Sequence, residues 1–115
     1  MSSKEATDSA LCPRFHRAVE LIGRRWTGAI IRVLLPGPLR FNELLAAIPG
    51  ISDRLLTERL RELEAQQIVA REVATESPVR VSYALTCRGR ELRAPLDALG
   101  DWAERWIGTE PEVAP

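Results

Sequence analysis

The sequence predicts a mainly α fold with one small β-hairpin. Two observations indicate this fold class. Over most of the 115 residues, apolar side chains recur at spacings of three and four, as on one face of a helix. Between residues 68 and 85 the spacing falls to two, as in a strand with one buried face. Two short helices joined by a tight turn and followed by a hairpin make a winged helix-turn-helix.

The composition is that of one small globular domain. Apolar residues make up 45% of the chain, which allows a small core, and chains of this size often extend their core by dimerising. No apolar run approaches the ~18 residues of a membrane helix, and the N-terminus lacks the pattern of a signal peptide. We therefore expect a cytoplasmic protein with no membrane partner. Two cysteines predict no disulfide framework.

The formal net charge is zero, but the charges are unevenly distributed. Residues 14–40 contain six Arg and one Glu, a local charge of +5. Residues 96–115 have a local charge of −4, since they contain one Arg and five acidic residues. The neutral chain therefore combines a basic N-terminal part with an acidic C-terminal part, and the basic part is the one suited to nucleic acid.

The folded domain is expected over residues 12–107 and includes a terminal dimerisation helix. Residues 1–11 are polar and are expected to form a mobile arm, and residues 108–115 a flexible tail. Pro13 is favoured at the first position of a helix, which places Cys12 at or near its N-cap. Gly23 is the expected C-cap of this helix.

Two more short helices are expected next. The first runs from Trp26 to Leu35, and a Pro-Gly-Pro sequence ends it. Residues 39–41 are long enough for a single rung of sheet. The next helix, Asn42 to Ile48, leads into a Pro-Gly-Ile turn. The inward residues expected on the first of these helices are Trp26, Ile30, Val33 and Leu34.

Residues 51–67 predict the helix around which the chain is organised. Leu56, Leu60 and Leu63 follow steps of four and three and form an apolar stripe, with Leu55 beside them. Ser52 precedes the run, where its hydroxyl can cap the first turn. The opposite face suits a DNA major groove, although an ordinary solvated face has the same pattern. It carries only hydrogen-bonding side chains: Asp53, Arg54, Thr57, Glu58 and Arg61.

The hairpin and the last helix complete the chain. Strands are expected at residues 68–75 and 79–85, joined by a turn at residues 75–78. The last helix should start near Thr86, and Pro95 predicts either a kink or the end of a short first segment. We expect its apolar stripe to pack against a second subunit, the alternative being the chain's own core. The stripe contains Leu92, Leu96, Leu99, Ala103 and Trp106, with Trp102 close to it.

Several short motifs occur in a characteristic order. They are Cys12-Pro13, G-R-R-W at residues 23–26, F-N-E-L at 41–44, P-G-I-S at 49–52, L-T-E-R-L-R-E-L-E at 56–64, Y-A-L-T at 83–86 with Gly89, and D-W at 101–102. Together they resemble the HxlR-type winged helix-turn-helix transcriptional regulators, relatives of the MarR-type fold, over residues 12–106. Asp53 and Glu58 stand where the family commonly has Gln or Lys, although a carboxylate can accept a hydrogen bond from cytosine N4.

The resemblance implies a homodimer joined mainly through the first and last helices. It also implies recognition helices in successive major grooves and hairpin wings on flanking DNA. Members are repressors or activators, and several respond to oxidants or electrophiles through a cysteine at the position of Cys12. A thiol at a helix N-terminus near Arg14 and Arg17 has its thiolate form favoured. The alternative for Cys12 is a buried structural cysteine at the dimer interface.

Four sets of candidate residues follow. The DNA-binding set on and before the recognition helix is Ser52, Asp53, Arg54, Thr57, Glu58 and Arg61. The candidates for phosphate contact are Arg40, Arg24, Arg25 and Thr27, and Ser77 and Arg80 belong to the wing. The expected dimer contacts are Phe15, Val19, Leu96, Leu99, Trp102, Ala103 and Trp106. Arg59 is left out, since it lies nearer the leucine stripe.

The function predicted is that of a sequence-specific DNA-binding regulator and most simply a repressor. Its partners would be double-stranded DNA, a second copy of itself and an oxidant or small-molecule effector. No enzyme, metal or cofactor is expected, because there is one histidine, no metal-ligand spacing and no Gly-rich phosphate loop. The alternative is a winged-helix dimer that binds an apolar ligand or a protein and has weak DNA affinity.

Overall fold

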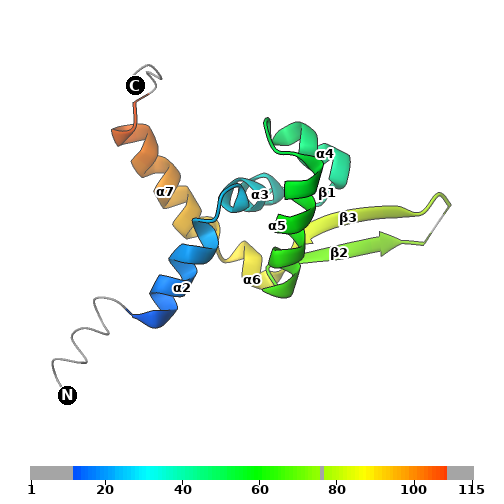
Figure 1. Cartoon of the computed structure of the whole chain (residues 1–115), viewed down its shortest axis with the longest axis horizontal. Helices are drawn as coiled ribbons and strands as arrows, with labels where there is room; N and C mark the ends of the chain where they lie inside the picture. The colour runs from blue at the N-terminus through cyan, green and yellow to red at the C-terminus, as the bar shows by residue number, and fades with distance from the viewer. Residues whose placement is uncertain (1–11, 76, 109–115) are drawn as a thin grey trace.

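The computed structural model describes residues 12–75 and 77–108 (Figure 1). The expected arm at residues 1–11, Glu76 of the hairpin turn and residues 109–115 of the expected tail lie outside the described residues. The elements are α2 (Pro13–Ile22), α3 (Thr27–Leu34), β1 (Leu39–Arg40), α4 (Phe41–Ala47), α5 (Asp53–Ala65), β2 (Val69–Ala74), β3 (Arg80–Leu85), α6 (Cys87–Arg90) and α7 (Arg93–Trp106). This order confirms the mainly α fold with a β-hairpin.

The first helix, α2, begins and ends where the sequence predicts. Cys12 is its N-cap, Pro13 is its first residue and Gly23 is its C-cap. The Gly23 N–H donates to the carbonyl of Val19 at 2.8 Å, which satisfies one of the last carbonyls of the helix. None of the residues of α2 is buried. The helix therefore lies on the outside of the fold and leaves much of its apolar surface uncovered.

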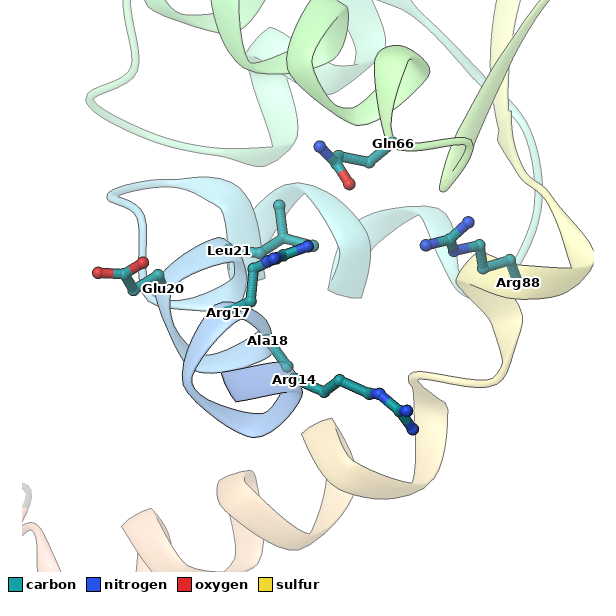
Figure 2. A pocket seen from close by; sticks show the side chains of 7 residues that line it. All are labelled: Arg14, Arg17, Ala18, Glu20, Leu21, Gln66 and Arg88. Atoms are coloured by element: carbon teal, nitrogen blue, oxygen red, sulfur yellow. The ribbon is translucent and has the colours of Figure 1, made fainter. Parts of the chain in front are cut away.

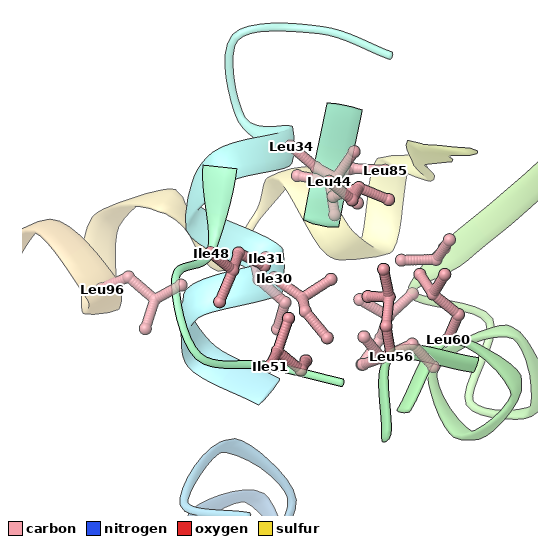
Figure 3. Close-up of a cluster of buried hydrophobic side chains, with 13 residues drawn as sticks. Ile30, Ile31, Leu34, Leu44, Ile48, Ile51, Leu56, Leu60, Leu85 and Leu96 are labelled. Carbon is pink, nitrogen blue, oxygen red and sulfur yellow. The ribbon is translucent and has the colours of Figure 1, made fainter. Parts of the chain in front are cut away.

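The core gathers around α3, where Ile30 and Ile31 have no exposed surface (Figure 3). Full burial of such a side chain contributes about 1.5–3 kcal/mol relative to leaving it in water. The leucine stripe of α5 packs into the same core, as predicted. The remaining buried apolar residues are Leu34, Leu44, Ile48, Ile51, Leu56, Leu60, Leu63, Ile68, Val69, Leu85 and Leu96.

The expected inward set for α3 is incomplete. Trp26 and Val33 pack against the core and are partly buried, whereas Ile31 and Thr27, which are not in the expected set, are fully buried. The buried side chains of α3 follow spacings of three, four and seven, which is the period of a helix face. The fully buried stripe is therefore centred between Thr27 and Ile31. Its members are Thr27, Ile30, Ile31 and Leu34.

The recognition helix α5 is capped as predicted. The hydroxyl of Ser52 accepts a hydrogen bond from the Leu55 N–H at 3.1 Å, which satisfies one of the free donors of the first turn. The turn that leads into α5 contains Gly50 at φ 96°, a left-handed conformation that favours glycine. A Cβ at this position would also lie 3.3 Å from the ring of Trp26. The helix-turn-helix therefore depends on glycine at residue 50.

Three antiparallel strands form one sheet in the order β1-β3-β2. The predicted rung is confirmed, since Leu39 pairs with Tyr83 and Arg40 with Ser82. In the hairpin the register runs from Val69 opposite Leu85 out to Ala74 opposite Arg80. Burial falls along its length, from fully buried residues at the base to exposed residues near the turn. The hairpin therefore projects away from the core (Figure 1).

The end of the chain resolves the two alternatives left by Pro95. Thr86 caps the short helix α6 by accepting from the Gly89 N–H at 3.1 Å, and α6 ends at Arg90. The break lies at Glu91 and Leu92, before Pro95, which occupies the first turn of α7. Proline is tolerated there, because the first turn has no intrahelical acceptor for its missing N–H. The short first segment is therefore the correct alternative.

In the view of Figure 1, α2 and α7 lie on one side of the molecule and the hairpin on the opposite side. The helix α5 lies between the hairpin and these two helices. The body that carries the recognition helix thus has a hairpin on one side and two exposed helices on the other. Among residues 12–75 and 77–108, no helix is long and apolar enough to cross a membrane.

Candidate nucleic-acid interface

The polar face of α5 points away from the core over its whole length. Asp53, Arg54, Glu58 and Arg61 are exposed, and Thr57 is partly buried. The leucine stripe holds the other side of the helix against α3 and the sheet. The predicted base-contacting side chains are thus brought together on one exposed surface, which we call the α5 face.

Two hydroxyl groups near the start of α5 are already hydrogen-bonded within the protein. Ser52 uses its oxygen to cap the helix, as described above. Thr57 donates its hydroxyl hydrogen to the carbonyl of Asp53 at 2.9 Å. The Thr57 methyl group and oxygen lone pairs remain for a base, and a threonine methyl is suited to the thymine C5-methyl.

The acidic residue in the middle of the α5 face lies between two guanidinium groups. One oxygen of Glu58 is 3.7 Å from Nε of Arg54, and the other is 3.7 Å from Nη1 of Arg59. Such partly exposed pairs contribute about 0–1 kcal/mol to stability. The two positive charges offset the negative charge of this carboxylate on the α5 face.

Arg59 has a structural role. Its Nε donates to the backbone carbonyl of Arg25 at 2.9 Å, and its Nη1 lies 3.3 Å from Oε2 of Glu62. The residue is only 8% exposed. Its position confirms that it belongs to the buried side of α5, and it ties this helix to the turn between α2 and α3.

The phosphate candidates in that turn have different environments. Nε of Arg24 lies 2.9 Å from Oε1 of Glu62, so an acid of the protein already neutralises this guanidinium. Arg25 is exposed and stacks over the Trp26 ring, 5.0 Å from its centroid. Thr27 is wrong as a phosphate contact: it is 2% exposed and faces the core from the first turn of α3. Arg25 is the best placed of the three.

The other phosphate candidates meet beside the sheet. Arg40 and Arg80 line one shallow cavity of about 340 Å³ together with Ser82. The strand register explains this, because Arg40 pairs with Ser82 and Arg80 lies two residues from Ser82 on the same face. Glu43 also lines the cavity, but its Oε1 accepts from the backbone N–H of Arg40 at 2.8 Å. Ser77 is exposed in the turn of the hairpin.

The predicted dimer contacts are mostly exposed in the single chain. Phe15 and Val19 of α2 are 62% and 50% exposed. On α7, Leu99, Trp102 and Trp106 are exposed and Ala103 is partly buried. Leu96 is different, because it is 6% exposed and packs in the chain's own core, which leaves it little surface for a second subunit.

The two cysteines lie at the starts of two helices. Cys12 is the partly buried N-cap of α2, and Cys87 is the exposed first residue of α6. The Cys87 side chain is therefore accessible to solvent. A cavity lined by Arg14, Arg17 and Arg88 is not among the sequence predictions (Figure 2). Its residues come from separate segments, so no local pattern announces it.

Comparisons with known proteins agree with this arrangement. The sequence model of the HxlR-like helix-turn-helix family matches residues 21–111. The HTH-type transcriptional regulator YvaP of Bacillus subtilis (strain 168), described as uncharacterized, is 46% identical over 99 residues, which cover 86% of this chain and 92% of YvaP. The HTH-type transcriptional regulator YodB of the same organism is 45% identical over 98 residues, 85% of this chain and 88% of YodB.

Solved structures show the same similarity. The reduced form of YodB superposes with a TM-score of 0.78 at 46% identity, covering 87% of this chain and 96% of that chain. The redox regulator HypR in its reduced form gives 0.75 at 38% identity, covering 80% and 91%. YodB has also been solved in diamide-treated and quinone-bound forms. These relatives are transcriptional regulators and not enzymes. On its sequence and its fold, this chain belongs to the HxlR-like helix-turn-helix family of transcriptional regulators.

Proposed function

We propose that this regulator binds specific DNA as a homodimer, represses transcription from its operator and responds to oxidants or electrophiles through Cys12. The observation that carries the DNA-binding part is the α5 face. It presents Arg54, Thr57, Glu58 and Arg61 on a helix that is capped at Ser52 and anchored along its opposite side. A helix held in this way can enter a major groove with its side chains already ordered.

The phosphate contacts proposed around this helix come from three places. Arg25 lies at the turn before α3, and Arg40 and Arg80 lie beside the sheet. Contacts of this kind position a protein on the duplex, whereas contacts to base edges select the sequence. We therefore assign base readout to the α5 face, and positioning to Arg25, Arg40, Arg80 and the exposed Ser77.

The homodimer is supported by apolar surface that the single chain leaves in water. Leu99, Trp102 and Trp106 follow spacings of three and four, so they share one face of α7, and Trp106 is 68% exposed. Phe15 and Val19 form a similar strip on α2. Exposure of neighbouring apolar and aromatic side chains to water is unfavourable, and aromatic residues are enriched at protein interfaces. A second copy would cover both helices.

The sensing role of Cys12 is supported by its position and by relatives. It is the N-cap of α2, where the helix N–H groups favour a thiolate, and α2 is one of the two proposed dimer helices. Chemical modification at this point would act directly on the dimer geometry. YodB, described in quinone-bound and diamide-treated forms, and the redox regulator HypR both share this fold.

Repression and a cytoplasmic location belong to the same proposal. A protein that occupies operator DNA when reduced and leaves it when oxidised switches its target gene on under oxidation.

The alternative, a dimer whose main role is to bind a protein or an apolar ligand, draws on one observation. Asp53 and Glu58 cancel the charges of Arg54 and Arg61, which leaves the α5 face neutral.

The test is a fluorescence-anisotropy titration of the full chain against DNA from around its own gene and against a scrambled duplex. Specific binding that falls steeply with salt is expected, because neutralised phosphates release counterions. Arg54→Ala should weaken specific binding, whereas Arg105→Ala, which removes the same charge from α7, should not. Equal affinity for both duplexes, with equal effects of the two variants, would favour the alternative.

A further inference from the structure

A concave surface lies away from the α5 face, at the junction of α2, α6 and the end of α5 (Figure 2). The cavity has a volume of about 540 Å³, which is within the range of small-molecule sites. We call it the arginine cavity. Its lining residues are Arg14, Arg17, Ala18, Glu20, Leu21, Gln66 and Arg88.

The wall that α2 contributes is one face of the helix. Arg14, Arg17, Ala18 and Leu21 follow spacings of three, four and seven, so they lie above one another along α2. Phe15 and Val19, which form the proposed dimer strip of α2, occupy a different face of the helix. The cavity can therefore stay open to solvent when a second subunit covers that strip.

Among the residues that the structure describes, no ion pair balances the arginines of the cavity. Arg14, Arg17 and Arg88 take part in none of the ion pairs formed within residues 12–75 and 77–108. Figure 2 shows the Arg88 side chain extending from α6 toward α2 and Gln66 extending from the end of α5, while Arg14 extends from the lower end of α2 below them. Three guanidinium groups around one concavity repel one another, and a bound anion would relieve that repulsion.

The single acid in the lining does not compensate them. The Oε2 atom of Glu20 lies 3.3 Å from Nε2 of His16 and pairs with that side chain along the helix. Figure 2 shows the Glu20 carboxylate pointing away from the three arginines. The interior of the cavity thus offers guanidinium donors, one amide and the small apolar floor of Ala18 and Leu21.

We infer that the arginine cavity binds a small oxyanion with two or more negative charges, such as a phosphate ester or a di- or tricarboxylate. Guanidinium groups donate two parallel hydrogen bonds to either class of oxygen, which makes these bonds stronger than those between neutral groups. An anion held by Arg17 and Arg88 would bridge α2 and α6, and Gln66 at the C-cap of α5 would contact it as well. The site would thus join the dimer side of the molecule to the recognition helix.

The experiment uses the full chain without DNA, so that its result is independent of the proposed function. Inorganic pyrophosphate and citrate are titrated separately by calorimetry at constant ionic strength, with chloride as the reference anion. Saturable binding is expected for at least one of them, together with a rise in the unfolding temperature. Arg17→Gln and Arg88→Gln should each weaken binding by about tenfold or more. Both residues are exposed, so the variants should fold.

Arg71→Gln is the matched control, since Arg71 is an exposed arginine of β2 outside the lining. No saturable binding by the wild-type chain, or an equal loss in Arg71→Gln, would overturn the proposal. So would dissociation of a dimer by Arg17→Gln without any anion binding, since the arginines would then pair with acids of a second subunit. An operator titration separates the two sources of phosphate. If Arg17→Gln and Arg88→Gln lower DNA affinity as much as pyrophosphate affinity, the cavity serves the DNA backbone and not a small anion.

Discussion

The guanidinium of Arg59 in α5 donates to the backbone carbonyl of Arg25 at 2.9 Å, across 34 positions of sequence. This bond joins the recognition helix to the turn that follows the first helix. A second link joins the same two elements, because the side chain of Arg24 in the turn pairs with Glu62 of α5. Glu62 also lies 3.3 Å from Arg59. The orientation of the α5 face therefore depends on a polar link as well as on the leucine stripe.

Replacement of Arg59 should destabilise the fold. Arg59→Met keeps most of the aliphatic stem but removes the hydrogen bond to Arg25 and the pair with Glu62, and should lower the free energy of unfolding by about 1–3 kcal/mol. Urea denaturation measures this change. Arg61→Met, two residues away on the exposed face, should change stability by no more than about 0.5 kcal/mol. Similar losses in the two variants would show that the link to Arg25 contributes nothing.

Two arginines at the proposed DNA surface should affect binding in different ways. Arg61→Ala should relax the preference at one base pair, by about 1–3 kcal/mol, because it removes a contact to a base edge. Arg80→Ala should weaken binding to all DNA sequences alike, because it removes a phosphate contact. It should also reduce by about one the slope of the logarithm of affinity against the logarithm of salt concentration. Anisotropy titrations on a panel of single-base operator variants distinguish the two. If Arg61→Ala lowered the affinity for all operator variants equally, Arg61 would contact phosphate and not a base.

The two glycine positions Gly89 and Gly37 give a matched pair for stability. A Cβ at Gly89 would collide with the carbonyl oxygen of Ile68 and press on the side chain of Leu85, whereas one at Gly37 meets nothing within 4 Å. Gly89→Ala should therefore cost about 1–3 kcal/mol or more, as overpacking does. Gly37→Ala should stay within about 0.5 kcal/mol of the wild type. Thermal or urea unfolding of both variants checks this, and equal stabilities would contradict the close approach of α6 to residue 68.

The proposed dimer can be tested with two equally mild surface changes. Leu99 is 57% exposed on α7 and Val79 is 64% exposed in the hairpin, so an Asp at either position should leave the fold intact. Leu99→Asp should weaken self-association by about 2 kcal/mol or more, because it places a charge in the centre of an apolar interface. Val79→Asp should leave association unchanged. Sedimentation velocity measures both, and a dimer that survives Leu99→Asp would place the interface elsewhere.

The sensing proposal predicts a difference between the two cysteines. Wild-type protein and Cys87→Ser should leave operator DNA when diamide is added, and Cys12→Ser should stay bound. Gel-shift titrations of the reduced and treated proteins give the comparison, with recovery on addition of dithiothreitol as the sign of a reversible modification. If Cys87→Ser alone loses the response, the exposed thiol of α6 is the sensor instead.

Much of the fold follows from local patterns. The leucine stripe, the Ser52 cap and the strict alternation of residues 79–85 each predict an element that the structure contains, because burial and capping impose their spacing directly on the sequence. Pro95 predicts a discontinuity but not its place. The break falls at Glu91 and Leu92, because proline fits the first turn of a new helix.

The differences between prediction and structure have two physical causes. Thr27 has the chemistry of a phosphate contact, but the phase of the α3 stripe turns it into the core, and the spacing from Thr27 to Ile30, Ile31 and Leu34 contains that information. For Arg24 no such signal exists. Its partner Glu62 is distant in sequence, and only the folded chain brings the two together. The arginine cavity escapes sequence analysis for the same reason.

The fall in burial along β2 and β3 has a consequence for how such regulators diversify. The base of the hairpin shares the core through Val69 and Leu85, so its sequence is constrained by folding. Its described outer residues, from Arg71 to Ala74 and at Val79 and Arg80, are exposed. One residue added to each strand near the turn would lengthen the arm by about 3.3 Å without disturbing a buried side chain. In the proposed DNA complex, such a change would alter how far the hairpin reaches along flanking DNA while the core stays the same.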